Sequence, residues 1–247
     1  MARCKLRNNR LQALWRCLGC VGARPKPGSK SCGPRKGTRR QSPPELVRRL
    51  GSAAVTAVDP SEQFVRAARE RLPGVNVVLA SAEHLPFPEG SFDAVLAQLV
   101  VHFMTDAVAG LTEMARVTRS GGVVAASVWD HAGGQGPLSA FWEAARALDP
   151  EVADESDLAG AREGHLEELF EGAGLQKIEA TILWVSIEQP TFQEWWEPFM
   201  LGVGLAGSYT AGPEPDRRRQ LRDLCHERFP NEPLVVTARA WAARGLA

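Results

Sequence analysis

Long apolar runs are absent from this sequence of 247 residues. The longest is about seven residues, well short of the roughly 18 that a membrane-spanning helix needs. The basic start is not followed by an unbroken apolar stretch or by the small-residue cleavage site that secretory signals have. We therefore expect a soluble protein of the cytoplasm.

Acidic residues are missing from the first 44 positions, which hold 12 lysines and arginines. Because 12 of the 29 basic residues lie there, 17 basic residues face 29 acidic ones in the remainder, and the net charge of zero describes neither part. Four of the five cysteines also lie in this segment: Cys4, Cys17, Cys20 and Cys32. We expect residues 1–43 to have little packed structure beyond a weak helix from Leu6 to Leu18, with low order over residues 20–43.

From about residue 52 onward, short apolar runs alternate with helical patterns, which is typical of a parallel sheet covered by helices on both faces. The apolar fraction of 44% is enough to bury a core. Two late strands would pair antiparallel at one edge of the sheet. The patterns predict strands at 53–58, 75–80, 92–98, 123–128, 177–187 and 234–241, and helices at 61–72, 106–118, 138–148, 164–173 and 217–228.

In an open parallel sheet, ligands bind at the carboxyl ends of the strands. Asp59 directly follows the first predicted strand of this region. A carboxylate in that place accepts hydrogen bonds from the two neighbouring hydroxyls of a ribose, which suits an adenosine-containing cofactor. The alternative is an aspartate that only caps the helix beginning near Ser61.

Several segments occur in a characteristic order: Asp59, the stretch 80–87, the strand 92–98 and the stretch 116–122. This order and spacing resemble class I S-adenosylmethionine-dependent methyltransferases, in particular small-molecule methyltransferases similar to the ubiquinone and menaquinone biosynthesis enzymes. The resemblance is strong over about residues 45–130. It implies a Rossmann-like, mostly parallel sheet with helices on both faces and an antiparallel edge strand over residues 44–247. It also implies S-adenosylmethionine as the cofactor and a small-molecule methyl acceptor as the partner.

The resemblance further implies roles for the cofactor-binding residues. Asp59 would hold the ribose hydroxyls, Ser81, Ala82 and Glu83 would lie along the adenine, and Gln98 would lie near the methionine part. Ser81 departs from the family, which commonly has aspartate there. A serine hydroxyl still accepts a hydrogen bond from the adenine amino group, but without charge.

Other residues would face the substrate. His102 either contacts substrate or cofactor or is a plain histidine at a helix entry. Residues 190–230 lie where such families insert a substrate-covering segment, so that Trp195, Trp196 and Phe199 form either the roof of an apolar pocket or the apolar face of an ordinary helix. Methyl transfer mainly needs alignment and exclusion of water, so we assign no catalytic residue and no metal. His102 or His131 would serve as base for a hydroxyl or an acidic carbon.

The family's first strand and its glycine-rich turn, expected just before a helix that begins near Glu45, are not recognisable. Glycine is needed there because the backbone turns sharply and approaches the cofactor closely. The composition of residues 1–43 is that of a GC-rich coding region read in the wrong frame, which favours a frameshifted or misassigned N-terminus over a genuine basic extension. We expect the central strand to be missing, so activity and cofactor binding by the chain as written are in doubt.

Other functions remain open at this point. A zinc site built on Cys4, Cys17, Cys20 and Cys32 has no recognised spacing. A nucleic-acid-binding basic segment has only Trp15 to stack on a base. A nicotinamide-dependent oxidoreductase would also place an acid after its second strand, but it too needs a glycine-rich turn. The non-enzymatic alternative is a methyltransferase-like remnant or interaction protein. The oligomeric state and the atom methylated are not encoded in any recognisable pattern.

Overall fold

A computed structural model of the chain describes residues 5–6, 20–23, 43–202, 204–212 and 214–247. These residues form an eight-stranded sheet of order β1-β7-β8-β6-β5-β2-β3-β4. The strands are β1 (Lys5–Leu6), β2 (Cys20–Ala23), β3 (Val55–Asp59), β4 (Asn76–Leu79), β5 (Phe92–Gln98), β6 (Thr118–Trp129), β7 (Gln176–Gln189) and β8 (Leu234–Leu246).

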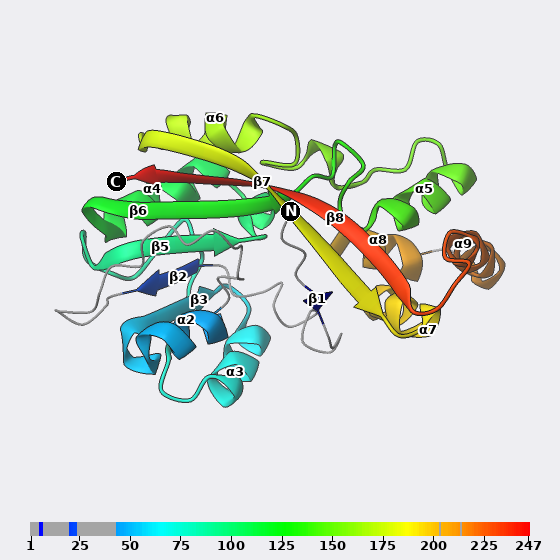
Figure 1. Cartoon of the computed structure of the whole chain (residues 1–247), viewed down its shortest axis with the longest axis horizontal. Helices are drawn as coiled ribbons and strands as arrows, with labels where there is room; N and C mark the ends of the chain where they lie inside the picture. Colours follow the sequence, from blue (N-terminus) through cyan, green and yellow to red (C-terminus); the bar gives the residue numbers. More distant parts are fainter. Residues whose placement is uncertain (1–4, 7–19, 24–42, 203, 213) are drawn as a thin grey trace.

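Helices lie on both faces of the sheet and beyond one end of it (Figure 1). The α-helices are α2 (Pro43–Leu50), α3 (Glu62–Arg71), α4 (Ala107–Val117), α5 (Ser139–Leu148), α6 (His165–Gly172), α7 (Phe192–Trp196), α8 (Gly204–Ala211) and α9 (Pro215–Glu227). Short 3-10 helices are η1 (Ser52–Ala54), η2 (Val101–Phe103), η3 (Glu155–Asp157) and η4 (Glu197–Leu201). The expected Rossmann-like α/β class is confirmed, and none of the helices in the described ranges has the length and apolar character to cross a membrane.

The predicted strands reappear with shifted boundaries. The strand predicted at 92–98 has those limits in β5, whereas the one predicted at 53–58 starts later because residues 52–54 form η1. β6 begins at Thr118 rather than at 123. Its pairing with β5 shifts register between Phe92, opposite Thr118, and Ala94, opposite Val123, and Gly121 in the extra residues has a φ of 70°. β8 likewise runs on to Leu246, past the predicted end at 241.

β2 occupies the centre of the sheet, between β3 and β5, and runs antiparallel to both. Cys20 lies opposite Val58 of β3, and Val21 lies opposite Leu96 of β5. The sequence predicted a missing central strand and low order over residues 20–43. In the structure Cys20–Ala23 fills that central place, whereas the low order of the segment stays a prediction. The edges of β3 and β5 need partners for their backbone groups, and this short uncharged stretch of the basic segment supplies them.

The rest of the basic segment was predicted to hold a weak helix from Leu6 to Leu18. Leu6 pairs with β7 as part of β1, where Lys5 lies opposite Ser186. Residues 7–19 and 24–42, which include most of that helix and the stretch expected to be of low order, lie outside the described residues.

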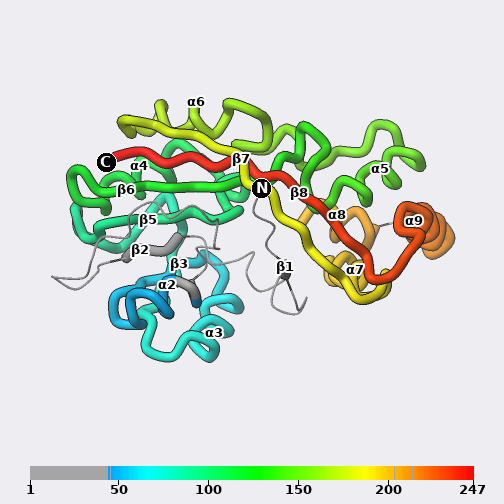
Figure 2. Tube along the Cα trace, viewed as in Figure 1, coloured from blue at the N-terminus to red at the C-terminus, as the bar shows by residue number. Residues whose placement is uncertain are grey.

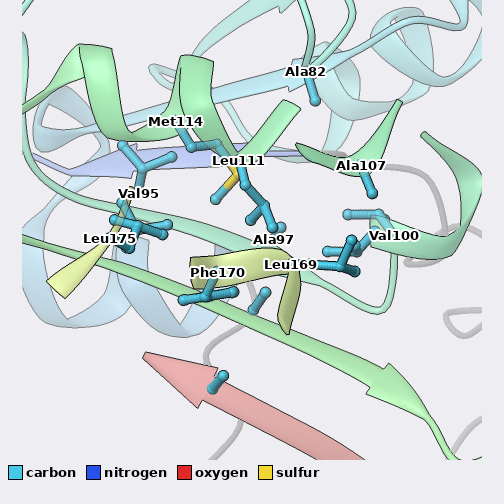
Figure 3. Close-up of a cluster of buried hydrophobic side chains, with 14 of the residues drawn as sticks. Ala82, Val95, Ala97, Val100, Ala107, Leu111, Met114, Leu169, Phe170 and Leu175 are labelled. Atoms are coloured by element: carbon cyan, nitrogen blue, oxygen red, sulfur yellow. The ribbon is translucent and has the colours of Figure 1, made fainter. Parts of the chain in front are cut away.

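The two faces of the sheet carry separate apolar cores, because side chains of a strand alternate between faces. On one face α4 and α6 pack on β5, β6 and β8, with Leu111, Met114 and Phe170 fully buried (Figure 3). On the other face α2 and α3 cover β3 and β4, with Val55 and Val65 at the centre. The predicted helices at 61–72 and 106–118 correspond to α3 and α4, which bury Val65 and Ala68, and Leu111 and Met114, respectively.

β7 and β8 pair antiparallel over their whole length and extend past the carboxyl end of β6 (Figure 2). β6 ends at Trp129, opposite Ala240, so that the first half of β8 pairs with β7 alone among the described strands. Helices α5, α7, α8 and α9 gather on this projecting ribbon (Figure 1), and we call them, with η4, the helical lobe. α7, η4, α8 and α9 lie within residues 190–230, and α9 corresponds to the basic helix predicted at 217–228.

Candidate functional site

The carboxyl ends of β3, β4, β5 and β6 lie at one edge of the sheet. β3 is parallel to β4, β5 is parallel to β6, and β2 is antiparallel to both β3 and β5, so all four strands point the same way. The chain leaves these strands at Asp59, Ala80, Gln98 and Asp130 respectively. This edge is where an open α/β sheet binds ligands. It is also the end of the sheet from which the helical lobe projects (Figure 1).

Asp59 is the last residue of β3, and its side chain is buried, with 2% exposed. One carboxylate oxygen, Oδ1, accepts a hydrogen bond from the backbone N–H of Ser61 at 2.8 Å. Burial raises the pKa of Asp59 to about 6, against the lowering effect of that hydrogen bond. The carboxylate therefore caps the start of α3, as the alternative interpretation required. A carboxylate accepts about four hydrogen bonds, so the capping role leaves capacity for a ligand.

The segment after β4 is held beside Asp59. Leu79 pairs with Asp59, and the N–H of Ala80 donates to the Asp59 carbonyl at 3.1 Å, which places Ser81 at the same edge. Ala82 is buried against α4, where a Cβ on Gly110 would lie 3.5 Å from the Ala82 methyl and 2.6 Å from the Met104 sulfur. Glycine at 110 thus permits this close approach. The side chain of Ala82 belongs to the core, so only its backbone is available to a ligand.

The same segment is anchored by α4. Oε1 of Glu83 accepts from the Thr105 N–H at 2.8 Å, so its carboxylate ties the segment to the approach to α4. The guanidinium of Arg116 donates to the carbonyls of Phe87 (2.9 Å) and Leu85 (3.0 Å). Hydrogen bonds from Arg116 to both carboxylate oxygens lower the pKa of Glu113, and Oε2 of Glu113 also accepts from the Leu85 N–H at 3.1 Å. These bonds fix the segment 81–88 as a preorganised wall of the site.

Gln98 ends β5 opposite Ser127 of β6. The next residue, Leu99, has a φ of 58°, in the left-handed region that a leucine enters only at a cost of about 1–2 kcal/mol. Its N–H donates to the Ser127 carbonyl at 2.8 Å, which holds the sharp turn in place. Strain of this kind is characteristic of functional sites. The sequence did not predict it, because leucine rarely adopts the left-handed backbone conformation.

His102 lies in η2, just after that turn, and is buried. Its ring centroid is 5.5 Å from that of His131, which follows β6, and 4.0 Å from that of Phe103. The two histidines that the sequence singled out as bases therefore lie together at the edge where β5 and β6 end. Sequence alone gave no reason to place them side by side.

Trp195, Trp196 and Phe199 are buried inside the helical lobe, with 6%, 4% and 7% exposed. Phe199 stacks on Phe141 of α5 at a centroid distance of 4.6 Å. The rings thus form the core of the lobe, in line with the ordinary-helix alternative, and the lobe as a whole lies beyond the carboxyl edge. The structure does not bring these three side chains into contact with Asp59, Ser81 or Gln98 through any hydrogen bond or ring contact among the described residues.

An ion pair that the sequence did not predict lies at the carboxyl end of β6. Nε of Arg239 on β8 donates to Oδ2 of Asp130 at 2.7 Å, and Asp130 is buried. Oδ1 of Asp130 accepts from the Gly133 N–H at 2.9 Å, and a Cβ at 133 would lie 2.5–2.6 Å from the carboxylate oxygens. Glycine at 133 is therefore required by this close packing. The two ion-pair partners are 109 positions apart in the sequence, so no local pattern predicts the contact.

A small cavity of about 30 Å³ lies between the loop after β6 and α5. His131 lines it together with Trp142 and the buried carboxylate of Glu155. The indole Nε1–H of Trp142 has no acceptor among the described residues. A cavity of this size accommodates one or two water-sized groups. The remaining lining residues are Gly134, Ser139, Glu143, Arg146 and Asp154.

The described residues fit the ribose and base of an adenosine-containing cofactor better than the part attached to the ribose. Asp59 and the segment beginning at Ser81 supply a buried acceptor beside a fixed wall, as a ribose and its base need. Between Asp59 and Gln98, however, lies the start of β2 rather than its end, because β2 runs antiparallel. No described helix begins there after a central strand. Among the described residues, no cluster of three or more potential ligands is placed to hold a metal, and Cys4, Cys17 and Cys32 lie outside them.

Residues 37–126 match a family described as "Methyltransferase domain". The match contains Asp59, Ser81–Glu83, Gln98 and His102, and it ends within β6. It excludes the helical lobe and β7 and β8.

Curated relatives align with the same region. A demethylmenaquinone methyltransferase of Beutenbergia cavernae is 38% identical over 114 residues, 45% of each chain. A trans-aconitate 2-methyltransferase of Rhodopseudomonas palustris is 36% identical over 100 residues, 40% of this chain and 37% of the other. A ubiquinone/menaquinone biosynthesis C-methyltransferase of Cupriavidus pinatubonensis is 32% identical over 118 residues, 46% of this chain and 49% of the other. The chain spans less than half the length of each of these relatives.

Solved structures resemble the chain over a longer stretch and at lower identity. A putative methyltransferase solved with the Haloferax volcanii Trm112 activator is 18% identical, with a TM-score of 0.49 over 83% of this chain and 76% of the other. The Bacillus subtilis YcgJ protein is 19% identical, with a TM-score of 0.47 over 77% and 81%. Neither likeness bears on activity.

Proposed function

Because the chain carries a domain of the class I S-adenosylmethionine-dependent methyltransferase family, we propose that its carboxyl edge binds S-adenosylmethionine and serves methyl transfer to a small-molecule acceptor. The relatives whose names specify acceptors act on demethylmenaquinone and trans-aconitate, which are small molecules. The acceptor of this chain is proposed to belong to that broad class.

One observation carries the proposal: Asp59 is a buried carboxylate at the end of β3, with a fixed wall of backbone beside it. Burial makes its ionised form costly, and the raised pKa of about 6 still leaves most of the carboxylate charged at pH 7. A buried charge of this kind is stabilised by hydrogen-bond donors. The vicinal hydroxyls of a ribose are such donors, and they carry no charge that would compete with the cap on α3.

The chain's own residues would divide the work as follows. Asp59 binds the ribose, the segment from Ser81 to Glu83 lies along the base, and the fold excludes water from the edge. The bound cofactor supplies an activated methyl group, so the protein must above all align the acceptor with it. If the acceptor is a hydroxyl or an acidic carbon, His102 or His131 would take its proton.

The acceptor would enter from the side of the helical lobe. His131 lies both beside His102 and on the lining of the small cavity, and the lobe stands past the ends of the parallel strands. Trp195, Trp196 and Phe199 would then act as the packed base of a cover rather than as direct contacts. This retains residues 190–230 as a substrate-covering insertion.

The antiparallel direction of β2 favours a second candidate, a methyltransferase-like remnant without catalysis. In that case the edge keeps its shape but does not hold the methionine part in a reactive position. The family match over residues 37–126 gives no support to the nicotinamide-dependent oxidoreductase.

Calorimetric titration with S-adenosylhomocysteine tests the proposal. Asp59→Ala removes hydrogen bonds worth about 1.5–3 kcal/mol each and should weaken binding at least tenfold. Asp93→Asn is the matched control, because Asp93 lies on β5 near its amino end and pairs with the exposed Arg119. Its affinity should equal that of the unmodified chain. Unchanged affinity in Asp59→Ala would return Asp59 to a helix cap only.

A further inference from the structure

His102 and His131 come from different strand ends and meet at the carboxyl edge. His102 lies in η2, shortly after β5 ends at Gln98, and His131 lies shortly after β6 ends at Trp129. Their ring centroids are 5.5 Å apart, with the edge of one ring toward the face of the other. Two imidazoles at this separation repel each other when both are charged, so the proton affinity of each depends on the charge of the other.

The two histidines differ in what surrounds them. His102 is buried, with 7% exposed, and it follows Gln98, where the proposed function puts the methionine part of the cofactor. His131 is half-buried and lines the cavity of about 30 Å³ beside α5, which lies past the carboxyl end of β6 (Figure 1). Glu155, with 6% exposed, and Glu143, whose side chain is 61% exposed, line the same cavity. The cavity thus brings His131 together with one buried carboxylate and one that reaches solvent.

The charged groups around His131 are mostly acidic, whereas the ring that packs on His102 from its own helix, Phe103, carries no charge. The charged residues that line the cavity or adjoin His131 are Glu143, Arg146, Asp154, Glu155 and the pair of Asp130 with Arg239. Arg146 pairs with Asp154, and Arg228 lies 3.4 Å from Glu143. Because these four carboxylates face three arginines, a proton that leaves His131 toward the cavity enters a surrounding that attracts positive charge.

Methyl transfer to a hydroxyl or an acidic carbon releases one proton. The bond from the acceptor atom to its hydrogen breaks, and the electron pair of that atom forms the bond to the methyl carbon. The electron pair of the broken carbon–sulfur bond stays on sulfur, so the positive charge of the sulfonium is lost and the proton carries an equal charge away. Because such a site excludes water, the proton needs a base inside and a path to solvent.

We propose, on the basis of the proposed function, that His102 and His131 form a proton relay with the cavity. His102 takes the proton of the acceptor and passes it to His131, and a water molecule, which a cavity of this size can hold, transfers it to Glu155 and past Glu143 to solvent. The substrate class is thereby narrowed to small molecules that are methylated at a hydroxyl or at an acidic carbon. A thioether or a tertiary amine loses no proton on methylation and has no use for the relay.

NMR titration of the five histidines in the full chain tests the coupling without any ligand. In His131→Gln, the titration midpoint of His102 should rise by about half a pH unit or more, because a neighbouring positive charge is removed. Glu155→Gln should lower the midpoint of His131, because a negative charge across the cavity is removed. Glu151→Gln is the matched control, since it removes the same charge from an exposed position in the same segment outside the cavity lining. It should leave His131 unchanged.

Two ligands that differ in charge at sulfur test where the pair lies. S-adenosylmethionine has a positive sulfonium and S-adenosylhomocysteine a neutral thioether. Protonation of the histidine pair should weaken binding of S-adenosylmethionine relative to S-adenosylhomocysteine by about threefold or more between about pH 8 and pH 5.5. Titration of Asp59, whose pKa is about 6, acts on the ribose that both ligands share and cancels in the ratio of their affinities. In His102→Gln the ratio should vary less with pH.

The outcomes separate the relay from the function on which it rests. Independent titration of the two histidines, or a His131 midpoint that is the same in Glu155→Gln and Glu151→Gln, would overturn the relay. An affinity ratio that is constant with pH in the unmodified chain would overturn it as well. In each case, binding of S-adenosylhomocysteine that is weakened by Asp59→Ala leaves the proposed function standing.

Melting curves establish that each variant is folded. If Glu155→Gln does not fold, the midpoint of His102 in His131→Gln and the affinity ratio of the unmodified chain decide the outcome. Failure of the unmodified chain to bind either ligand would overturn the proposed function and the relay together.

Discussion

The guanidinium of Arg239 and the carboxylate of Asp130 join the last strand of the sheet to the loop that follows β6. The two residues are also tied through the backbone, since the Asp130 N–H donates to the Arg239 carbonyl at 3.0 Å. The Arg239 guanidinium lies over the ring of Trp241, 4.7 Å from its centroid. One side chain thus satisfies a buried charge, packs on an aromatic ring and positions the loop that carries His131.

Asp130→Ala is expected to destabilise the chain by about 3–5 kcal/mol, because removing one partner of a buried pair leaves the other without compensation. The matched control is Glu179→Ala, since Glu179 on β7 pairs with Arg244, on the same strand β8 as Arg239, but with both side chains largely exposed. An exposed pair contributes about 0–1 kcal/mol. Urea unfolding of the two variants measures the difference, and equal losses would show that burial of Asp130 has no special effect.

The raised pKa of Asp59 should be visible in the pH dependence of the free energy of unfolding. Its carboxyl titrates near 3.8 when the chain is unfolded and near 6 when it is folded. The folded state therefore holds the proton more tightly, so Asp59 favours folding below about pH 4 and this contribution is lost as the pH rises through 6. Relative to Asp59→Asn, the unmodified chain should lose about 2–3 kcal/mol between pH 4 and pH 7. Unfolding free energies of the two proteins that stay parallel across this range would contradict the raised pKa.

Trp196→Ala tests whether the lobe aromatics are core or substrate contacts. Removing a buried indole should cost about 3–5 kcal/mol of stability. Trp184→Ala provides the comparison, because Trp184 on β7 is 48% exposed, and its loss should cost under about 1 kcal/mol. Chemical unfolding followed by far-UV circular dichroism gives both values. A small loss for Trp196→Ala would indicate that its ring lies at a surface open to substrate.

Hydrogen exchange should locate β2. The backbone N–H groups of a strand paired on both sides open only with large parts of the sheet, so Val21 and Gly22 should exchange on the timescale of β3. Exposed turns such as that around Gly134 provide the fast reference. Exchange of residues 20–23 as rapid as this reference would return the segment to the low order that its composition predicts.

The parallel part of the fold could be predicted from the sequence because its signals are local. Strand and helix periods between residues 55 and 129 follow from apolar spacing, and Asp59 follows from its place after a strand. The strand β2 was not readable, because Cys20–Ala23 is four residues long and lies in a segment whose composition indicates no packing. It pairs there because β3 and β5 present backbone groups on both sides, which is a property of the assembled sheet.

The residues of the candidate site could be predicted from the sequence to a similar extent. Asp59, the segment from Ser81 and Gln98 all lie at one edge, as the order of the strands implied. Asp130, Arg239 and Trp142 were missed because their importance depends on contacts between distant parts of the chain. The aromatic residues of the lobe were singled out correctly as apolar, but the sequence could not decide between a pocket roof and a packed interior.

The ribbon of β7 and β8 belongs to both halves of the molecule at once. Leu234, near one end of β8, is buried with the lobe aromatics, whereas Trp241 and Ala243, further along the same strand, are buried with the main core. Because one continuous strand is buried in both cores, the helical lobe cannot move as a rigid lid about a flexible linker. Opening a path for an acceptor would have to come from the loops around His131, and the two cores should melt as a single cooperative unit.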